Sequence, residues 1–376
     1  MEPGPGLLAG RTGGRVAQRV AVVGGGVLGA STAARLAAGG AEVTLLTEST
    51  LASGASGRSL SWLNSAGPYR EEYRRLRLLG LERYRALPDG GAHVRFDGGL
   101  HWGDGARDAF TRQQQVGYPA EWLSPEDVAG RVPGVDPAAV AAEGAVLNPD
   151  EGWVDLPSLV GQLVGDLTTA GGEVRTGAGR CEPVVRGGRV VGVRGGDGAV
   201  HAGDAVVLAT GAAVPAALAE LGVPVPDATS LALLVRTAPV DTPLHAVLNT
   251  PRVALRPAPG GGLVLDAAWS EEEVVARDDG TFEVRDATVA GLLREASHVL
   301  AGRPLLTAAS WGAGRKPIPG DGQPVVGAVP GVDGLHVAFT HSGATLGLVV
   351  GELLAEEVLT GEPSSLLATF RVDRFG

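Results

Sequence analysis

A glycine motif near the N-terminus constrains the fold of this chain more than any other feature. Gly24, Gly26 and Gly29 follow the apolar residues 20–23 and precede an alanine-rich stretch that extends to Ala38. Between a strand and a helix, this spacing is typical of dinucleotide binding. The first glycine permits a tight turn, the second lets a pyrophosphate approach the backbone, and the third allows close strand-helix packing. The motif predicts a dinucleotide site and does not separate FAD from NAD.

A second strand is predicted over residues 42–46, so that strand, helix and strand begin a doubly wound sheet. In such sheets an acidic residue at the end of the second strand binds the ribose. Here Thr47 follows the strand directly and Glu48 comes next. A shift of one residue moves a side chain to the opposite face, so Glu48 serves only if the strand has already turned. The alternative is a carboxylate that faces solvent.

The remaining sequence alternates between two patterns. A helix is predicted over residues 156–170, with short strands near 173, 184, 190, 199 and 205–209. Antiparallel strands are predicted at 231–237, 245–250, 252–257 and 263–267. Alternation around Asp97-Gly98-Gly99 predicts a hairpin over 93–103. A glycine- and proline-rich loop is expected at 312–324, then a strand at 335–339 and a helix at 343–359.

These patterns predict an α/β protein in which two domains are interleaved. A Rossmann-type nucleotide-binding domain is expected to comprise residues 19–65, 150–225 and 311–376. An antiparallel-sheet substrate domain is expected to comprise residues 66–149 and 226–310. Residues 1–18 are rich in glycine, proline and arginine and are predicted to be a disordered leader.

Composition narrows the classes of partner. The formal net charge of −11 disfavours nucleic acid as a partner, and no stretch approaches the roughly 20 continuous apolar residues of a membrane span. The single cysteine, Cys181, excludes an internal disulfide and a cysteine-rich metal site, and no metal site is predicted. We expect a cytoplasmic protein without nucleic-acid or membrane partners.

Four further segments carry a family resemblance: SGASGR at 53–58, ATG at 209–211, GRKPIPGDGQPVVG at 314–327 and THSGATLG at 340–347. With the glycine motif, and in this order from about residue 19 to 361, they resemble the D-amino-acid oxidase, glycine oxidase and sarcosine oxidase superfamily of FAD enzymes. The resemblance implies that the first domain is a Rossmann-type FAD-binding domain.

The resemblance also implies where FAD lies: its ADP end on the glycine turn, the 56–58 loop beside the pyrophosphate and flavin, and the C-terminal segment against the flavin ring. The residues expected to contact FAD are Gly24, Gly26, Val27, Leu28, Gly29, Thr47, Glu48, Ser56, Gly57, Arg58, Thr210, Gly211, Gly343, Ala344, Thr345 and Leu346. Cys181 lies far from the segments where relatives attach flavin covalently, so it is expected to be a buried small residue and FAD to be noncovalent.

The helix predicted from Gly343 directs unpaired N–H groups outward, and these would stabilise negative charge on a reduced flavin. Thr340 or Ser342 is expected to cap this helix. The alternative is an ordinary capped helix behind a glycine turn.

Lys316 is the only lysine in the chain. It stands where members of the superfamily carry an arginine that clamps the substrate carboxylate, and lysine lacks the planar fork of arginine. Three roles are open: a point-charge clamp, a cation near the reactive flavin atoms that assists oxygen, or a structural ion pair. Arg315 is an alternative clamp. His341 is either a catalytic residue, which hydrogen-bonds the flavin or tunes its charge, or a structural one.

The resemblance thus implies an FAD-dependent oxidase acting on CH–NH or CH–NH2 donors of an amine or amino acid. The substrate C–H would deliver hydride to flavin N5, the imine would hydrolyse, and O2 would reoxidise the flavin and leave as H2O2. One alternative is a dehydrogenase, or a tailoring enzyme for a carrier-bound or secondary amine, that uses another acceptor. Another is a flavoprotein without catalysis. The resemblance implies that the sheet of the second domain roofs the substrate, and the sequence does not choose the contacts among its Tyr69, Tyr73, His101, Trp102, His245, Arg252, Arg256 and Trp269. Strand alternation predicts that Arg252 and Arg256 share one face.

Overall fold

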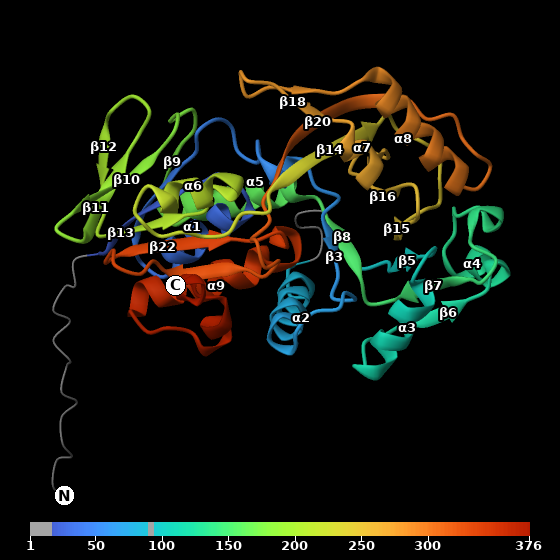
Figure 1. Cartoon of the computed structure of the whole chain (residues 1–376), viewed down its shortest axis with the longest axis horizontal. Coiled ribbons are helices and arrows are strands. Elements are labelled where there is room, and N and C mark those ends of the chain that lie inside the picture. Colours follow the sequence, from blue (N-terminus) through green and yellow to red (C-terminus); the bar gives the residue numbers. More distant parts are fainter. Residues whose placement is uncertain (1–16, 89–93) are drawn as a thin grey trace, which may run out of the picture.

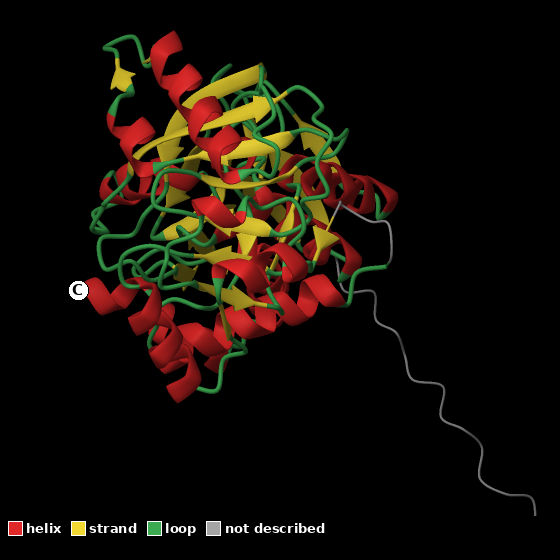
Figure 2. Ribbon diagram, turned by 90° about the vertical axis from the view of Figure 1, so that its right-hand side faces the viewer, coloured by secondary structure: helices red, strands yellow, loops and turns green. Residues whose placement is uncertain are grey.

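The computed structural model of the chain describes residues 17–88 and 94–376. All but two residues of the predicted leader therefore lie outside the described part. The structure has two main sheets that lie side by side, with helices mostly on the outside (Figures 1 and 2). None of the described helices is long and apolar enough to cross a membrane.

The first sheet has six strands, five of them parallel. In spatial order it consists of β21 (Val325–Ala328), β22 (Leu335–Phe339), β13 (Ala205–Leu208), β1 (Arg19–Val23), β2 (Glu42–Leu46) and β9 (Glu173–Arg175). β21 is antiparallel to β22. The parallel strands are short and largely apolar, as expected for strands with both faces covered.

One face of this sheet packs against α1 (Val27–Ala38), α5 (Leu156–Thr169) and α9 (Gly343–Thr360), and α9 also packs against α2 (Glu71–Arg85). On the other face lies a three-stranded sheet of β10 (Glu182–Arg186), β11 (Arg189–Arg194) and β12 (Val200–Ala202), together with α6 (Val214–Ala219). Gly351 of α9 lies against Ser31 of α1, where a Cβ would overlap the serine side chain. The glycine thus allows the two helices to approach closely.

The second sheet has eight strands and is mostly antiparallel. In spatial order it consists of β20 (Ala308–Lys316), β14 (Ser230–Thr237), β17 (Leu263–Asp266), β16 (Ala254–Pro257), β15 (Val247–Asn249), β5 (Gly99–His101), β7 (Ala145–Asn148) and β6 (Glu121–Leu123). Around it lie α3 (Ala106–Gln115), α4 (Pro125–Arg131), α7 (Ala268–Glu272), α8 (Asp286–Val299) and the strand pair of β18 (Val275–Ala276) with β19 (Phe282–Glu283). Its apolar core is separate from that of the first sheet.

Between the sheets runs a small three-stranded sheet of β3 (Trp62–Leu63), β8 (Gly152–Val154) and β4 (Val94–Arg95) (Figure 1). The prediction of a hairpin around Gly98 is wrong. β4 pairs with β8, whereas β5 pairs with β7 and β15, so the two strands diverge into different sheets. Gly98, at φ +92°, supplies the sharp turn that separates them.

The glycine- and proline-rich segment after residue 311 also differs from its prediction. Its first residues complete the nine-residue strand β20, which pairs with β14. Gly312 and Gly314 do not form a turn here. A Cβ on Gly314 would lie 2.9 Å from Cδ of Arg58, so the missing side chains make room for the arginine.

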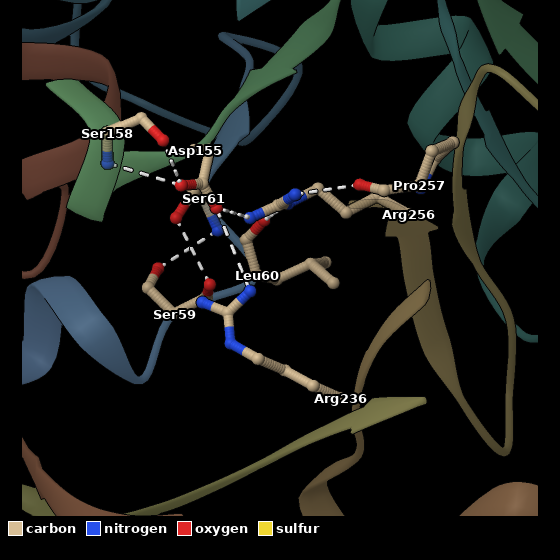
Figure 3. A network of polar contacts seen from close by, with 8 residues as sticks. All are labelled: Ser59, Leu60, Ser61, Asp155, Ser158, Arg236, Arg256 and Pro257. Atoms are coloured by element: carbon tan, nitrogen blue, oxygen red, sulfur yellow. Dashed lines mark hydrogen bonds and ion pairs between the residues drawn. The ribbon is translucent and has the colours of Figure 1, made fainter. Parts of the chain in front are cut away.

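A buried polar network joins the two sheets (Figure 3). Asp155 caps the N-terminus of α5, and Arg236 and Arg256 of the eight-stranded sheet each approach its carboxylate to 3.7 Å. Arg256 is fully buried and donates to the carbonyls of Leu60 and Pro257. Arg252, predicted to share a strand face with Arg256, instead precedes β16 and is exposed. The network fixes the 59–61 segment between the sheets.

Gly29→Ala tests the packing of α1 on the glycine turn. A Cβ at this position would overlap the carbonyl oxygen of Gly24, so we expect a loss of stability of about 1–3 kcal/mol in urea unfolding. The matched control is Gly161→Ala in α5, where nothing lies within 4 Å of an added Cβ. Its helix should gain about 0.5–1 kcal/mol. A Gly29→Ala protein as stable as the wild type would contradict this packing.

Candidate active site

One cavity of about 790 Å³ extends from the glycine turn to the end of the second sheet. Its walls include Gly24 and Gly26 at one end, the N-terminal residues of α9 along one side, and Ala232, Asp266 and Lys316 at the other end. Its volume lies within the range of ligand pockets, roughly 300–1,000 Å³. The residues predicted to bind the dinucleotide and the residues of the second sheet therefore line the same cavity.

The glycine turn is held too tightly for side chains at two of its three positions. Gly24 has φ +122°, and a Cβ there would overlap the carbonyl oxygen of Ala209. Gly29 is pressed against Gly24 in the same way. Around Gly26, in contrast, only Ser56 Oγ comes within 4 Å of an added Cβ, at 3.1 Å. The backbone at Gly26 is thus open to the cavity, as binding of a pyrophosphate requires.

The end of β2 brings both Thr47 and Glu48 to the cavity wall. Thr47 is buried, whereas Glu48 is exposed. The carbonyls of both residues accept hydrogen bonds from the 178–179 segment, at 3.0 and 3.2 Å, after the β2 ladder has ended. The turn that Glu48 needs in order to reach a ribose is therefore present, and its role in ribose binding stays a prediction.

The loop between Ser53 and Arg58 lies over the start of α1. Ser56 accepts a hydrogen bond from the Val27 N–H at 3.0 Å. Arg58 donates to the carbonyls of Ser53 and Gly54 and lies along β20. Ser56 and Arg58 line the main cavity, and Gly57 lines a neighbouring pocket of about 230 Å³.

Further groups on the cavity wall are poised for a ligand. Thr210 and Gly211, after β13, line it, and Thr210 Oγ1 is buried without a hydrogen-bond partner among the described residues. Gly343, Ala344 and Thr345 of α9 line it as well. A polar group of this kind is explained by a ligand that the cavity is built to hold.

Ser342 occupies the N-cap position of α9, but its side chain makes no capping hydrogen bond. Its hydroxyl instead contacts Tyr73 at 2.6 Å and accepts from Arg77. Thr340 Oγ1 accepts a hydrogen bond from the N–H of Ser342 at 3.1 Å, so the prediction that Thr340 or Ser342 caps the helix is wrong. The first N–H groups of α9 are therefore available to a cofactor. Leu346 differs from its neighbours, because its side chain is fully buried in the apolar core and does not line the cavity.

The sequence gives no sign that Arg77 belongs to the site, because it lies in a run of charged residues typical of a solvent-exposed helix. Instead it is almost fully buried, at 3% exposure, and lines the cavity. It donates to Asn64 and Ser342 and lies 4.3 Å from the ring centroid of Tyr69. It places a positive charge beside the N-terminus of α9.

Lys316 forms an ion pair in the cavity wall. Its Nζ lies 2.6 and 2.7 Å from the two carboxylate oxygens of Glu271 in α7. Arg315 also lines the cavity, but it is exposed. The sequence gives no sign of Glu271 as a partner, because it lies in the run Glu271–Glu273, which is typical of an exposed surface. The assignment of Lys316 and Arg315 as catalytic residues stays a prediction.

His341 precedes α9 and is open to the cavity. Desolvation by the surrounding protein, with smaller effects of Lys316 and Arg77, lowers the pKa of His341 to about 4. The imidazole is therefore neutral near pH 7, so it offers one hydrogen-bond donor and one acceptor instead of a charge.

Glu151 lies fully buried behind the cavity wall. Oε1 accepts a hydrogen bond from the Tyr118 hydroxyl at 2.8 Å, and Oε2 has no partner within the described ranges. Burial raises the pKa of Glu151 to about 8, although Tyr118 and Arg77 act in the opposite direction. The carboxyl is thus largely protonated at neutral pH.

Cys181 is half-buried and lines the cavity, so the prediction of a buried position is only partly right. Burial, followed by the charges of Glu48 and Asp197, raises the pKa of its thiol. The protonated thiol is a poor nucleophile, and noncovalent attachment of FAD stays a prediction. Within residues 17–88 and 94–376 no group of three or more metal-ligating side chains is gathered.

Comparison with known proteins identifies the family. The model of the DAO family, FAD dependent oxidoreductases, matches residues 19–357. The chain belongs to this family. The cofactor is therefore FAD, and the glycine turn, the Thr210 hydroxyl, which has no partner in the part of the chain that the structure describes, and the start of α9 fit it.

Individual relatives agree with this assignment. The chain is 28% identical to glycine oxidase of Geobacillus kaustophilus over 94% of this chain and 96% of that protein. It is 31% identical to the tRNA 5-methylaminomethyl-2-thiouridine biosynthesis bifunctional protein MnmC of Thiobacillus denitrificans, over 93% of this chain and 58% of that protein. Among solved structures, L-amino acid deaminase of Proteus myxofaciens superposes with a TM-score of 0.81 at 18% identity, covering 100% of this chain and 96% of that one. This last similarity shows the fold.

Gly26→Val tests the site of the pyrophosphate. The new side chain would project into the open part of the cavity, so the purified variant should fold normally but lose its flavin absorbance. Gly165→Val in α5 is the control, since an added Cβ there meets nothing within 4 Å. Full FAD occupancy in the Gly26 variant would refute this placement.

Glu151→Gln tests the buried carboxyl. The folded protein raises the pKa of Glu151 from 4.5 to about 8, so between these pH values the folded state binds more protons than the unfolded state. The free energy of unfolding should therefore fall as pH rises through this window. Glutamine keeps an acceptor for the Tyr118 hydroxyl and cannot ionise. The free energy of unfolding of the variant should therefore decrease less between these pH values than that of the wild type.

The measurement is urea unfolding at several pH values between 5 and 8, with the exposed Glu143→Gln as control. A pH dependence that is the same in Glu151→Gln and the wild type would show that Glu151 is already ionised in the folded protein.

Proposed function

We propose that the protein is an FAD-dependent oxidase of an amine or amino acid, acting on a CH–NH or CH–NH2 donor. The observation that carries the proposal is the shared cavity, in which residues of the FAD cradle and polar residues of the second sheet face the same space. The relationship to a glycine oxidase over nearly the whole chain supports the substrate class.

The chemistry follows from this arrangement. Held by the glycine turn and the start of α9, FAD would supply a hydride acceptor for the carbon beside the substrate nitrogen, and the two electrons would pass with two protons to O2, giving H2O2. The substrate becomes an imine, which water hydrolyses to a carbonyl compound and an amine or ammonia. The protein contributes mainly position and electrostatics.

Residues of this chain have separate parts in that scheme. Neutral His341 offers hydrogen bonds without repelling a cationic substrate. Arg77, beside the start of α9, adds to the positive potential that favours a negatively charged reduced cofactor. Arg315 is the arginine of this segment that does not form an ion pair within the described residues, so it stays the candidate for a substrate carboxylate.

The test is anaerobic bleaching of the flavin absorbance with D-, L- and N-methyl amino acids and simple amines. At least one compound should bleach the yellow protein, and air should restore the colour with about one H2O2 per flavin. Free FAD mixed with the same compounds is the control for bleaching that does not require the protein. A flavin that dithionite reduces but no amine of the panel reduces would contradict the proposal.

The pairing of Lys316 with Glu271 favours one second candidate, a dehydrogenase or tailoring enzyme for a secondary or carrier-bound amine. A paired lysine is a weaker clamp for a free amino-acid carboxylate and a weaker source of positive charge for oxygen activation. This enzyme would bleach with an amine but regain its colour slowly in air and rapidly with an electron-accepting dye.

A further inference from the structure

The substrate end of the cavity holds three ionisable side chains from three elements. Asp266 ends β17, Glu271 lies in α7, which follows β17 almost directly, and Lys316 ends β20. β14 separates β17 from β20 in the sheet. The three side chains thus belong to one wall, which faces the space where a substrate must lie.

Lys316 and Glu271 neutralise each other, whereas Asp266 is left without such a partner among the described residues. Lys316 makes both of its close contacts with Glu271. Asp266, in the part of the chain that the structure describes, has no hydrogen-bond or ion-pair partner. It is half-buried, and it lines the cavity. A desolvated carboxylate without partners is unfavourable unless a proton or a cationic ligand reaches it.

The groups around Asp266 leave it able to exchange a proton near neutral pH. Burial and the charge of Glu271 raise the pKa of Asp266 to about 7, against the smaller opposite effects of Lys316 and Arg256. Arg256 does not reach Asp266, since its guanidinium donates to Leu60 and Pro257 and faces Asp155. A proton acceptor works best when its pKa lies near the operating pH.

We propose that Asp266 binds the ammonium group of the substrate and accepts its proton, so that the enzyme takes amines in their protonated form. This inference rests on the proposed oxidation of an amine. Aliphatic amines are mostly protonated at neutral pH, and an ammonium nitrogen has no lone pair to expel hydride from the neighbouring carbon. In the step, an N–H bond of the ammonium breaks and an O–H bond forms on Asp266. The electron pair stays on nitrogen, and nothing is oxidised or reduced.

The first experiment measures binding without turnover. tert-Butylamine has no C–H beside its nitrogen and cannot be oxidised, so its affinity for the FAD-loaded protein can be measured by calorimetry at pH 7.5. Asp266→Asn should weaken binding by about tenfold to hundredfold, the loss expected for a hydrogen bond to a charged group. Asp104→Asn, in an exposed turn, should bind like the wild type. Equal affinity in Asp266→Asn, or no binding to the wild type, overturns the proposal.

The second experiment measures the pH dependence of the bleaching rate, which would not change if Asp266 had only a structural role. The anaerobic bleaching rate with the fastest amine of the panel, at low amine concentration, should level off above about pH 7 in the wild type. In Asp266→Asn only the free amine reacts, so the rate should rise about tenfold per pH unit toward the pKa of the amine. High pH should thus rescue the variant. The same pH profile in both proteins overturns the proposal.

The two experiments separate this inference from the proposed function. If an amine bleaches the wild type and Asp266→Asn keeps its pH profile, the oxidase proposal stands and the role of Asp266 fails. If no amine bleaches the wild type, the proposed function fails, and the loss of tert-butylamine affinity in Asp266→Asn still reports on cation binding alone. Circular dichroism and FAD content confirm that the variants are folded and loaded.

Discussion

The contact between the glycine turn and the carbonyl oxygen of Ala209 is the constraint on which the rest of the structure depends. It holds β1, the start of α1 and the end of β13 so closely that neither Gly24 nor Gly29 can carry a side chain. This packing leaves the backbone at Gly26 and the N-terminus of α1 open to one end of the cavity. α9 packs against α1 and brings its own N-terminus to the side of the same cavity. The position of the cofactor thus follows from backbone geometry.

Local patterns were sufficient to predict much of this framework. The strand at residues 42–46 has the predicted bounds, and the helices at 156–169 and 343–360 lie within one residue of them. These elements are long or strongly apolar and have clear terminal signals. The same signals failed for β20, because its glycines make room for the Arg58 side chain and do not form a turn. They also failed for the hairpin around Gly98, because its two strands join different sheets. Both errors come from long-range contacts that a local pattern does not contain.

Lys316 and Arg315 at the substrate end were predicted and line the cavity, whereas Asp266 and Glu271 were beyond prediction for a related reason. Asp266 closes an ordinary apolar strand and Glu271 lies in an acidic run, and only the pairing of three elements gives these side chains a common wall. Arg77 lies in a run typical of a solvated helix, yet the packing of α2 on α9 buries it. The predicted cofactor residues mostly line the cavity, because a motif fixes backbone positions. Catalytic residues depend on charges that meet only after folding.

The central claim is that one cavity holds both the cofactor and the substrate, with FAD gripped by the glycine turn and its ring beside the start of α9. A crystal structure of the yellow protein soaked with tert-butylamine under acidic and neutral conditions tests this most directly. The account predicts density for the pyrophosphate against Gly26, for the flavin ring beside Gly343 to Thr345, and for the amine nitrogen against Asp266. Flavin density at another place, or an amine bound away from the ring, would contradict it.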